Sequence, residues 1–210
     1  NEKGQSLKGT YVVFDLETTG FSSAKDKIIE IGAVKVENGE ITDKYSTFVN
    51  PKIPIPFRIT QLTSITDEMV MESPEIETIL PQFLKFVGDA VLVAHNASFD
   101  VSFIEENCRR QGIEPDFTSV DTVGLARVLL PTLSKFKLNV VAKALNISQE
   151  HHHRAVDDAR VTAEIYVKFI QMLEERGIET LDQMNHFGAH NAEAIRKMPS
   201  YHVIVLAKND

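Results

Sequence analysis

A short apolar run that ends in two acidic residues constrains this chain more than any other feature. The run, Tyr11–Leu16, is rich in β-branched and aromatic residues and has the length of a buried β-strand. Side chains two apart on a strand point to one face, so Asp15 and Glu17 stand side by side where the strand ends. Adjacent carboxylates at a buried strand end are costly unless a positive charge lies between them. A divalent cation is one interpretation, and a solvated acidic pair is the alternative.

The other apolar runs predict an α/β fold. Strands are expected at residues 11–16, 28–36, 44–49, 90–94 and 118–120. Helices are expected at residues 76–87, 97–111, 123–130, 138–145 and 157–176, with a shorter one from residue 66. Asn38-Gly39 is typical of a hairpin turn. We therefore expect a mixed central sheet, three antiparallel strands and then parallel strands, with helices on both faces. Ligands of such sheets gather beyond the carboxyl ends of the strands, where Asp15 and Glu17 lie.

Composition excludes some classes of protein. No apolar stretch approaches the ~20 residues that span a bilayer, and the single cysteine, Cys108, leaves no internal disulfide. We therefore expect a cytoplasmic protein that does not bind membranes. The net charge of −8 argues against a surface that holds nucleic acid over a wide area. It still permits a site that holds a few nucleotides through metal ions.

Two further acids are expected at the same strand ends. Asp100 lies in the first turn of the helix after the second apolar strand, on the face of Phe103 and Ile104, so it points toward the sheet. An aspartate that only stabilises the helix N-terminus is the alternative. In the last long helix, Asp158 lies at the edge of the apolar stripe whereas Asp157 points away from it. The helix geometry therefore favours Asp158 as a ligand.

A run of three histidines, residues 151–153, precedes that helix. One histidine beside a carboxylate cluster would serve as a general base, and the others would be loop residues. Zinc binding is an alternative, although the only cysteine is remote. Four acids that converge on one point require cations, and oxygen ligands suit Mg²⁺ or Mn²⁺. Two such ions a few ångströms apart are typical of sites that hydrolyse phosphodiester bonds.

The pattern of these residues resembles the DEDDh (DnaQ-like) group of 3′–5′ exonucleases, which have the ribonuclease H-like fold. Three motifs of that group are matched in order: Asp-x-Glu by Asp15 and Glu17, Asn-x-x-Phe-Asp by Asn96 to Asp100, and His-x-Ala-x-x-Asp by His153, Ala155 and Asp158. The resemblance implies that the four acids hold two divalent ions, Mg²⁺ or Mn²⁺, and that His153 is the general base.

The same resemblance implies a cradle for the terminal nucleotide. Its expected members are Thr18, Thr19, Gly20, Phe21, Leu62, His95, Asn96 and Phe99. Apolar and aromatic side chains of this sort hold unstacked bases with little sequence preference. For Leu62 and Phe99, core packing is the alternative.

Further stretches, among them His152-His153-Arg154-Ala155 and residues 201–209, resemble the exonuclease region of bacterial PolC-type DNA polymerase III. The resemblance implies a proofreading 3′–5′ exodeoxyribonuclease that releases nucleoside monophosphates from the 3′ end of single-stranded or frayed DNA. The remainder of the polymerase chain and the replisome would be its partners. A 3′–5′ exoribonuclease and a catalytically inactive nucleic-acid-binding module are the alternatives.

The chain begins with Asn1 and not Met, so we expect a segment of a longer polypeptide, with N-terminal processing as the alternative. Within it we expect a loose lead-in at residues 1–9 and an exonuclease domain at 10–176. A C-terminal helical appendage with a strand is expected at 177–210, packed with flanking polymerase regions.

Overall fold

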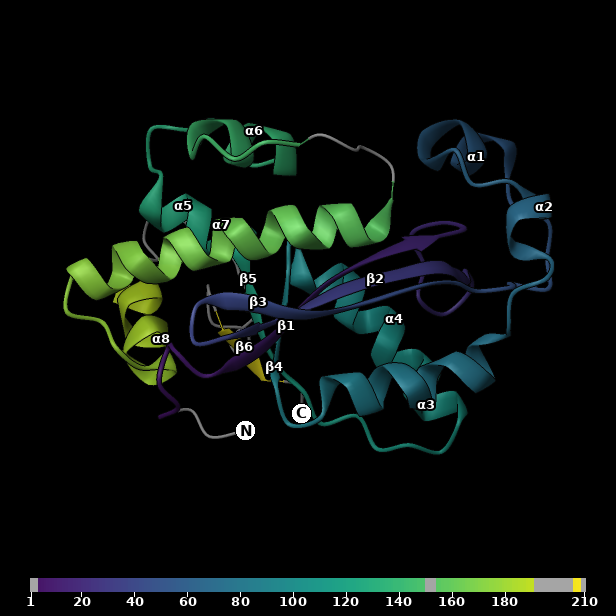
Figure 1. Ribbon diagram of the computed structural model, residues 1–210, viewed down its shortest axis with the longest axis horizontal. Coiled ribbons are helices and arrows are strands. Elements are labelled where there is room, and N and C mark those ends of the chain that lie inside the picture. Colours follow the sequence, from purple (N-terminus) through teal and green to yellow (C-terminus); the bar gives the residue numbers. More distant parts are fainter. Residues whose placement is uncertain (1–3, 150–153, 191–205, 209–210) are drawn as a thin grey trace.

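A six-stranded sheet forms the centre of the protein (Figure 1). The computed structural model describes residues 4–149, 154–190 and 206–208. The strands are β1 (Thr10–Thr18), β2 (Ile28–Glu37), β3 (Glu40–Phe48), β4 (Val91–Ala94), β5 (Thr118–Asp121) and β6 (Leu206–Lys208), and their order in the sheet is β3-β2-β1-β4-β5-β6. Strands β1, β2 and β3 form an antiparallel meander, β4 and β5 run parallel to β1, and β6 is antiparallel to β5. The predicted mixed sheet is confirmed.

Helices cover both faces of the sheet (Figure 1). They are α1 (Phe57–Thr63), α2 (Asp67–Val70), α3 (Ile76–Val87), α4 (Ala97–Arg110), α5 (Thr122–Leu129), α6 (Leu138–Ala144), α7 (Ala155–Glu175) and α8 (Leu181–His190). Helices α5 to α8 pack on one face and α3 and α4 on the other. None of the described helices is long and apolar enough to cross a membrane.

Strand β1 divides its side chains between the two cores. Tyr11 and Val13 pack under α7, whereas Val12 and Phe14 pack against α3 and α4. Alternation along the strand therefore directs the odd-numbered residues toward α7. This places the next odd-numbered side chain, Asp15, on the face from which α7 approaches.

The segment between β3 and α3 differs from the prediction. Residues 51–56 form the expected loop, but α1 follows directly at Phe57, where no helix was expected. Proline is well tolerated just before or at the start of a helix. The proline-rich run was interpreted only as a loop, so the helix that begins directly after it was not predicted. A small separate core supports α1 and α2 and consists of Ile29, Ile55, Ile59, Ile65 and Val70.

The beginning of the described chain packs against the segment before α8. Leu7 is 1% exposed, and its backbone nitrogen donates to the carbonyl of Glu179 over 2.9 Å. Leu181 donates in turn to the carbonyl of Gln5, also over 2.9 Å. Residues 5–7 are therefore not the loose lead-in that we expected. The division of the chain at residues 9 and 176 stays a prediction.

Candidate active site

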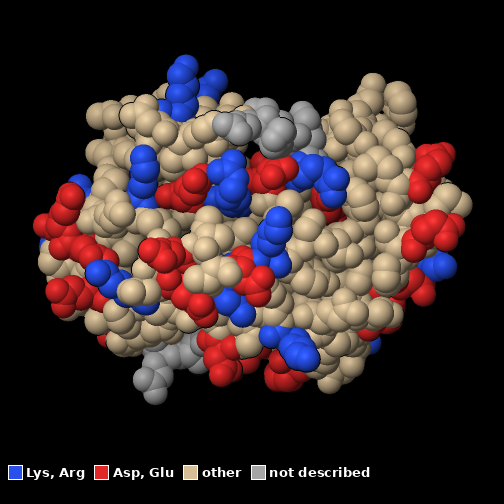
Figure 2. Space-filling view, in the orientation of Figure 1, with Lys and Arg blue, Asp and Glu red and all other residues tan. Residues whose placement is uncertain are grey.

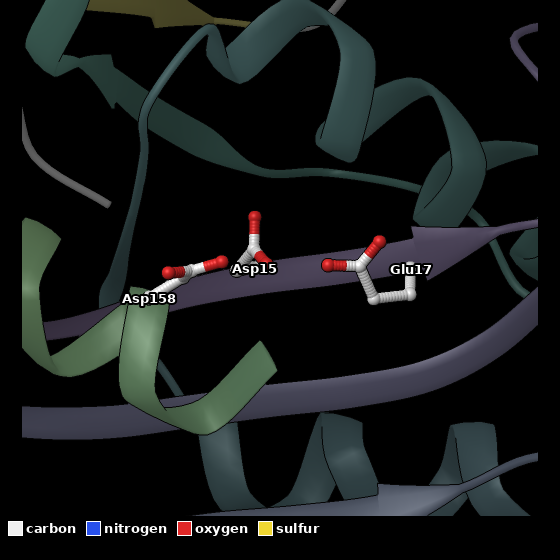
Figure 3. Close-up of side chains that lie close together, drawn as sticks. All are labelled: Asp15, Glu17 and Asp158. Carbon is white, nitrogen blue, oxygen red and sulfur yellow. The ribbon is translucent and has the colours of Figure 1, made fainter. Parts of the chain in front are cut away.

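Three carboxylates meet at the carboxyl end of β1 (Figure 3). Asp15 and Glu17 project from the strand, and Asp158 projects from the first turn of α7. One oxygen of each lies within 4.8 Å of the others, and all three residues are half-buried. Two elements far apart in the sequence thus bring three predicted ligands together.

The fourth predicted acid, Asp100, lies beside this group in the first turn of α4 and is only 3% exposed. One of its carboxylate oxygens accepts a hydrogen bond from the backbone nitrogen of Leu16 over 3.2 Å. Leu16 lies between Asp15 and Glu17 on β1, so this bond fixes Asp100 against the acidic end of the strand. The structure therefore assembles all four predicted acids at one place.

Burial makes this group electrostatically costly in the absence of a cation. Burial raises the pKa of Asp15 well above its usual range, and the neighbouring charges of Asp100 and Glu17 raise it further. Burial, followed by the charge of Asp158, raises the pKa of Glu17 to about 8. Burial also raises the pKa of Asp100, although the hydrogen bond from Leu16 opposes the shift. Carboxylate oxygens in this arrangement are compatible with a divalent metal ion.

A tightly bonded turn follows the acidic strand end. The Thr18 hydroxyl donates to the carbonyl of Gly20 over 2.6 Å, and the Thr19 hydroxyl donates to the Asp26 carboxylate over 3.3 Å. The backbone nitrogen of Ser22 donates to the other Asp26 oxygen over 2.9 Å. A Cβ atom at position 20 would lie 2.5 Å from that carboxylate, so only glycine fits there. The sequence reasoning missed Asp26, which holds the turn in one shape.

Apolar side chains line the edge of this turn. Phe21 is 72% exposed, and its ring centroid lies 6.3 Å from that of Phe99. Leu62, on α1, is 65% exposed, so core packing does not explain it. The guanidinium of Arg58, one helical turn before Leu62, lies 5.7 Å from the Phe21 ring centroid. An exposed apolar surface with an adjacent cation thus lies next to the acids.

His95 makes contacts that the sequence did not reveal. Its Nε2 lies 2.6 Å from the carbonyl oxygen of Phe136, and its Nδ1 lies 2.7 Å from the hydroxyl of Thr122. Because a carbonyl only accepts, Nε2 carries the hydrogen, and in the neutral ring Nδ1 accepts from Thr122. Burial lowers the pKa of His95, which favours this neutral form. Both ring nitrogens therefore already have partners within the chain. The expected contact of His95 with a nucleotide stays a prediction.

Asn96 and the start of α4 depend on a further acid that the prediction missed. Asn96 has a left-handed backbone, with φ of 71°, and its backbone nitrogen donates to the Asp121 carboxylate over 3.0 Å. The same oxygen of Asp121 accepts from Val123 over 2.9 Å at the start of α5. Asp121 thus joins the ends of β4 and β5 and orients the helix that carries Asp100. A single acid that ends a short apolar strand was the only signal for it in the sequence.

The third motif is only partly within the described residues. His153 and the two histidines before it lie outside them. Ala155 is fully buried, and Asp158 belongs to the acidic group whereas Asp157, among the described residues, does not. The predicted choice between the two aspartates therefore agrees with the geometry.

Comparison with known proteins identifies the family. The family model described as exonuclease, of the RNase T type, matches residues 12–166, which include all four acids. The chain belongs to this exonuclease family. The PolC-type DNA polymerase III of Clostridium perfringens is 54% identical over 210 residues, and that of Caldanaerobacter subterraneus subsp. tengcongensis is 47% identical over 208 residues. The chain spans 14% and 15% of the length of these two relatives.

Solved structures of exonucleases share the fold. A structure of exonuclease X in complex with 5′ overhanging duplex DNA is 30% identical, with a TM-score of 0.68, and the match covers 85% of this chain and 99% of that one. Exonuclease I, at 17% identity and a TM-score of 0.72, shares the fold over 92% of this chain and 47% of its own. The predicted ribonuclease H-like fold and the classification as an exonuclease, a hydrolase, are confirmed.

Proposed function

We propose that this chain is a metal-dependent 3′–5′ exodeoxyribonuclease. It removes nucleoside monophosphates from the 3′ end of single-stranded or frayed DNA, as the proofreading domain of a DNA polymerase III. The observation that carries the proposal is the group of four acids at the end of β1, because its converging carboxylate oxygens are compatible with a divalent cation and an exposed apolar surface lies at the turn that follows. Similarity to PolC-type polymerases supports DNA as the substrate and replication as the setting.

The four acids hold two divalent ions, Mg²⁺ or Mn²⁺. Carboxylate oxygens suit these cations, and one oxygen from each of three acids lies within 4.8 Å of the others. When bound, such ions activate the attacking water and stabilise the leaving oxygen. Asp15 is best placed to contact both ions, because the charges of Asp100, Glu17 and Asp158 all act on it.

His153 is the general base that takes the proton of the attacking water. Support comes from its place in the chain, directly before Arg154, at the end of α7 from which Asp158 joins the acidic group. An imidazole is suited to this step because its ordinary pKa is near neutrality.

The turn after β1 and the start of α1 hold the terminal nucleotide. Thr18, Thr19 and Gly20 offer backbone groups in a fixed shape, and Phe21, Leu62 and Phe99 offer apolar surface for the base. His95 and Asn96 border this cradle at the end of β4. A cradle built mainly from apolar surface accepts any base, as removal of a mismatched nucleotide requires.

The rest of the polymerase chain and the replisome deliver the DNA strand. The net charge is −8, and Lys and Arg side chains are interspersed with Asp and Glu on the face in Figure 2. Such a surface makes few phosphate contacts, so binding of DNA by this chain alone is weak.

The proposal is tested with single-stranded DNA and RNA of one sequence, each labelled at the 5′ end, in Mg²⁺, in Mn²⁺ and in EDTA. We expect DNA shortened stepwise from its 3′ end, released nucleoside monophosphates, no reaction in EDTA, and an intact circular DNA. Faster degradation of RNA would assign an exoribonuclease instead. A chain that binds the strands but cleaves neither with either metal would be an inactive binding module.

A further inference from the structure

A fully buried glutamate lies beneath the start of α7. Glu30, on β2, is 0% exposed, and each of its carboxylate oxygens accepts one hydrogen bond over 2.8 Å. The donors are the side-chain Nε of Arg154 and the backbone nitrogen of Ala155, which are the residue before the helix and its first residue. The guanidinium of Arg154 also lies 4.6 Å from the ring centroid of Phe48 on β3. The entry to α7 is thus attached to two strands.

A glycine two residues further along β2 brings the helix still closer. A Cβ atom at Gly32 would lie 2.0 Å from the backbone nitrogen of Val156 and 2.2 Å from the carbonyl carbon of Ala155. Residues 30 and 32 point to the same face of the strand. The glutamate therefore binds the first turn of α7, and the missing side chain at position 32 lets that turn rest on the strand.

This attachment lies next to the acidic group. Glu30 is the direct partner of Glu17 in the pairing of β1 with β2. Asp158 follows Ala155 by three residues, less than one turn of a helix. Any displacement or rotation of the helix start would move the Asp158 carboxylate relative to Asp15 and Glu17, which stay on the strand.

We propose that Glu30 and Gly32 are positioning residues that set the place of the Asp158 carboxylate in the metal site. Both oxygens of Glu30 are bonded to α7, so it acts through the helix and not as a metal ligand. Its charge is balanced by Arg154, which lowers the cost of burying it beside the other acids. The inference rests on the proposed function in one respect, that Asp158 is a metal ligand.

The variants Glu30→Ala and Gly32→Ala test this directly, with Mn²⁺ binding measured by titration calorimetry on the whole chain. We expect both to weaken Mn²⁺ binding by about 10–100-fold, as the loss of groups that orient metal ligands commonly does. Glu30→Gln keeps an acceptor for the Ala155 nitrogen and the volume of the side chain. It should fold like wild type and weaken Mn²⁺ binding by only about 3–10-fold.

A second readout separates positioning from general damage. At saturating Mn²⁺, KM for single-stranded DNA should stay within about twofold of wild type while the Mn²⁺ midpoint rises, because the nucleotide cradle lies on other elements. The matched control is Glu164→Gln on the same helix, where Glu164 lies 2.6 Å from Arg160 at its half-exposed surface. We expect this variant to bind Mn²⁺ as wild type does.

The outcomes are distinguishable. If Glu30→Gln and Gly32→Ala both fold and bind Mn²⁺ like wild type, the positioning role is wrong and the proposed function is untouched. A wild-type chain that binds Mn²⁺ but cleaves no nucleic acid would overturn the proposed function alone. A wild-type chain that binds no Mn²⁺ would overturn both.

Discussion

Acidic side chains lie in two contrasting settings in this molecule. On the last turns of α4, Glu106 lies 3.2 Å from the Nε of Arg110 and 3.7 Å from a guanidinium nitrogen of Arg109. These partners come from the same helix, one turn away, and solvent screens what they do not neutralise. The chain itself therefore balances the charge of this half-buried acid.

At the end of β1 the described part of the chain brings acids together without such a balance for Asp15, Glu17 or Asp100. Among the described residues, no lysine or arginine forms an ion pair with Asp15, Glu17 or Asp100. Arg154, which directly precedes α7, is bound to Glu30. The difference is explained if a cation completes the second setting, as the proposed function requires, and each prediction tests whether the two settings differ in this way.

The largest effect is expected from Asp15→Ala. The substitution removes the carboxylate that all the other acids act on, so we expect hydrolysis of single-stranded DNA to be abolished with Mg²⁺ or Mn²⁺ while the fold is retained. Asp157→Ala and Glu106→Gln are the controls from outside the acidic group, and both should cost little. A tenfold loss of rate corresponds to ~1.4 kcal/mol in barrier height. If Asp15→Ala kept activity within about tenfold of wild type, the acids at the end of β1 would not differ in function from those on α4.

Next in size is His153→Ala, which should lower turnover by roughly 10²–10⁴-fold, the usual contribution of a general base. His151→Ala and His152→Ala should be milder. If His152→Ala were the most damaging change, the register of the third motif would be wrong.

The stability of the metal-free protein should depend on pH through the buried acids. Their pKa values are raised in the folded state, that of Glu17 from 4.5 to about 8, so the folded protein holds protons that the unfolded chain has lost. The free energy of unfolding should therefore decrease as the pH rises from about 4.5 to about 8. Melting curves in EDTA across this range check it, and saturating Mg²⁺ should reduce the slope. A melting temperature that rises with pH in EDTA would show that the pKa values of these acids are not raised in the folded protein.

A smaller effect is expected from Asp100→Asn, which should raise the melting temperature in EDTA at a pH above about 8, where Glu17 is ionised. Like charges ~4 Å apart repel by about 4 kcal/mol at an effective dielectric constant near 20, so a net gain of ~1 kcal/mol is plausible after changes in hydrogen bonding. The asparagine oxygen still accepts from Leu16. For a chain of this size we expect a rise of about 2–4 °C. Glu106→Gln, which removes an acid from a balanced pair, should show no such gain.

That comparison extends to the metal-bound proteins. The melting temperature of wild type should rise by at least this difference when Mg²⁺ or Mn²⁺ is added, because a ligand that binds only the native state stabilises it. The melting temperature of Asp100→Asn should rise less. If wild type melts above Asp100→Asn in EDTA and neither responds to metal, the four acids do not form one cation site.

The parts of the fold and site that the sequence predicted are those that depend on local periodicity. Alternation in β1 showed that Asp15 and Glu17 share a face, and helical period placed Asp100 toward the sheet and Asp158 at the edge of the apolar stripe of its helix. Element order then placed all four at one end of the sheet. The pairing of β2 with β3 followed from the turn at residues 38–39, where both backbone φ angles are positive.

The parts that the sequence did not predict depend on contacts between distant residues. Glu30 reaches Arg154 across 124 positions, and Asp121 reaches Asn96 across 25, so neither contact leaves a local pattern. A glutamate within the otherwise apolar run of β2 was the only indication of Glu30. Leu62 was predicted as a site residue, but the helix that carries it, α1, was not predicted because a proline-rich loop precedes it. Asp26 is one of many surface-type residues in a loop, and only its hydrogen bonds distinguish it.

The most direct test of the central claim is a calorimetric titration of Mn²⁺ into wild type, Asp15→Ala and Glu106→Gln. We predict saturable binding to wild type and to Glu106→Gln, and none to Asp15→Ala. At pH 7 the binding should also release protons, because Glu17, with its pKa of about 8, must give up its proton to coordinate a metal ion. Equal binding to wild type and Asp15→Ala, or no saturable binding to wild type, would contradict the claim that a cation completes the acidic end of β1.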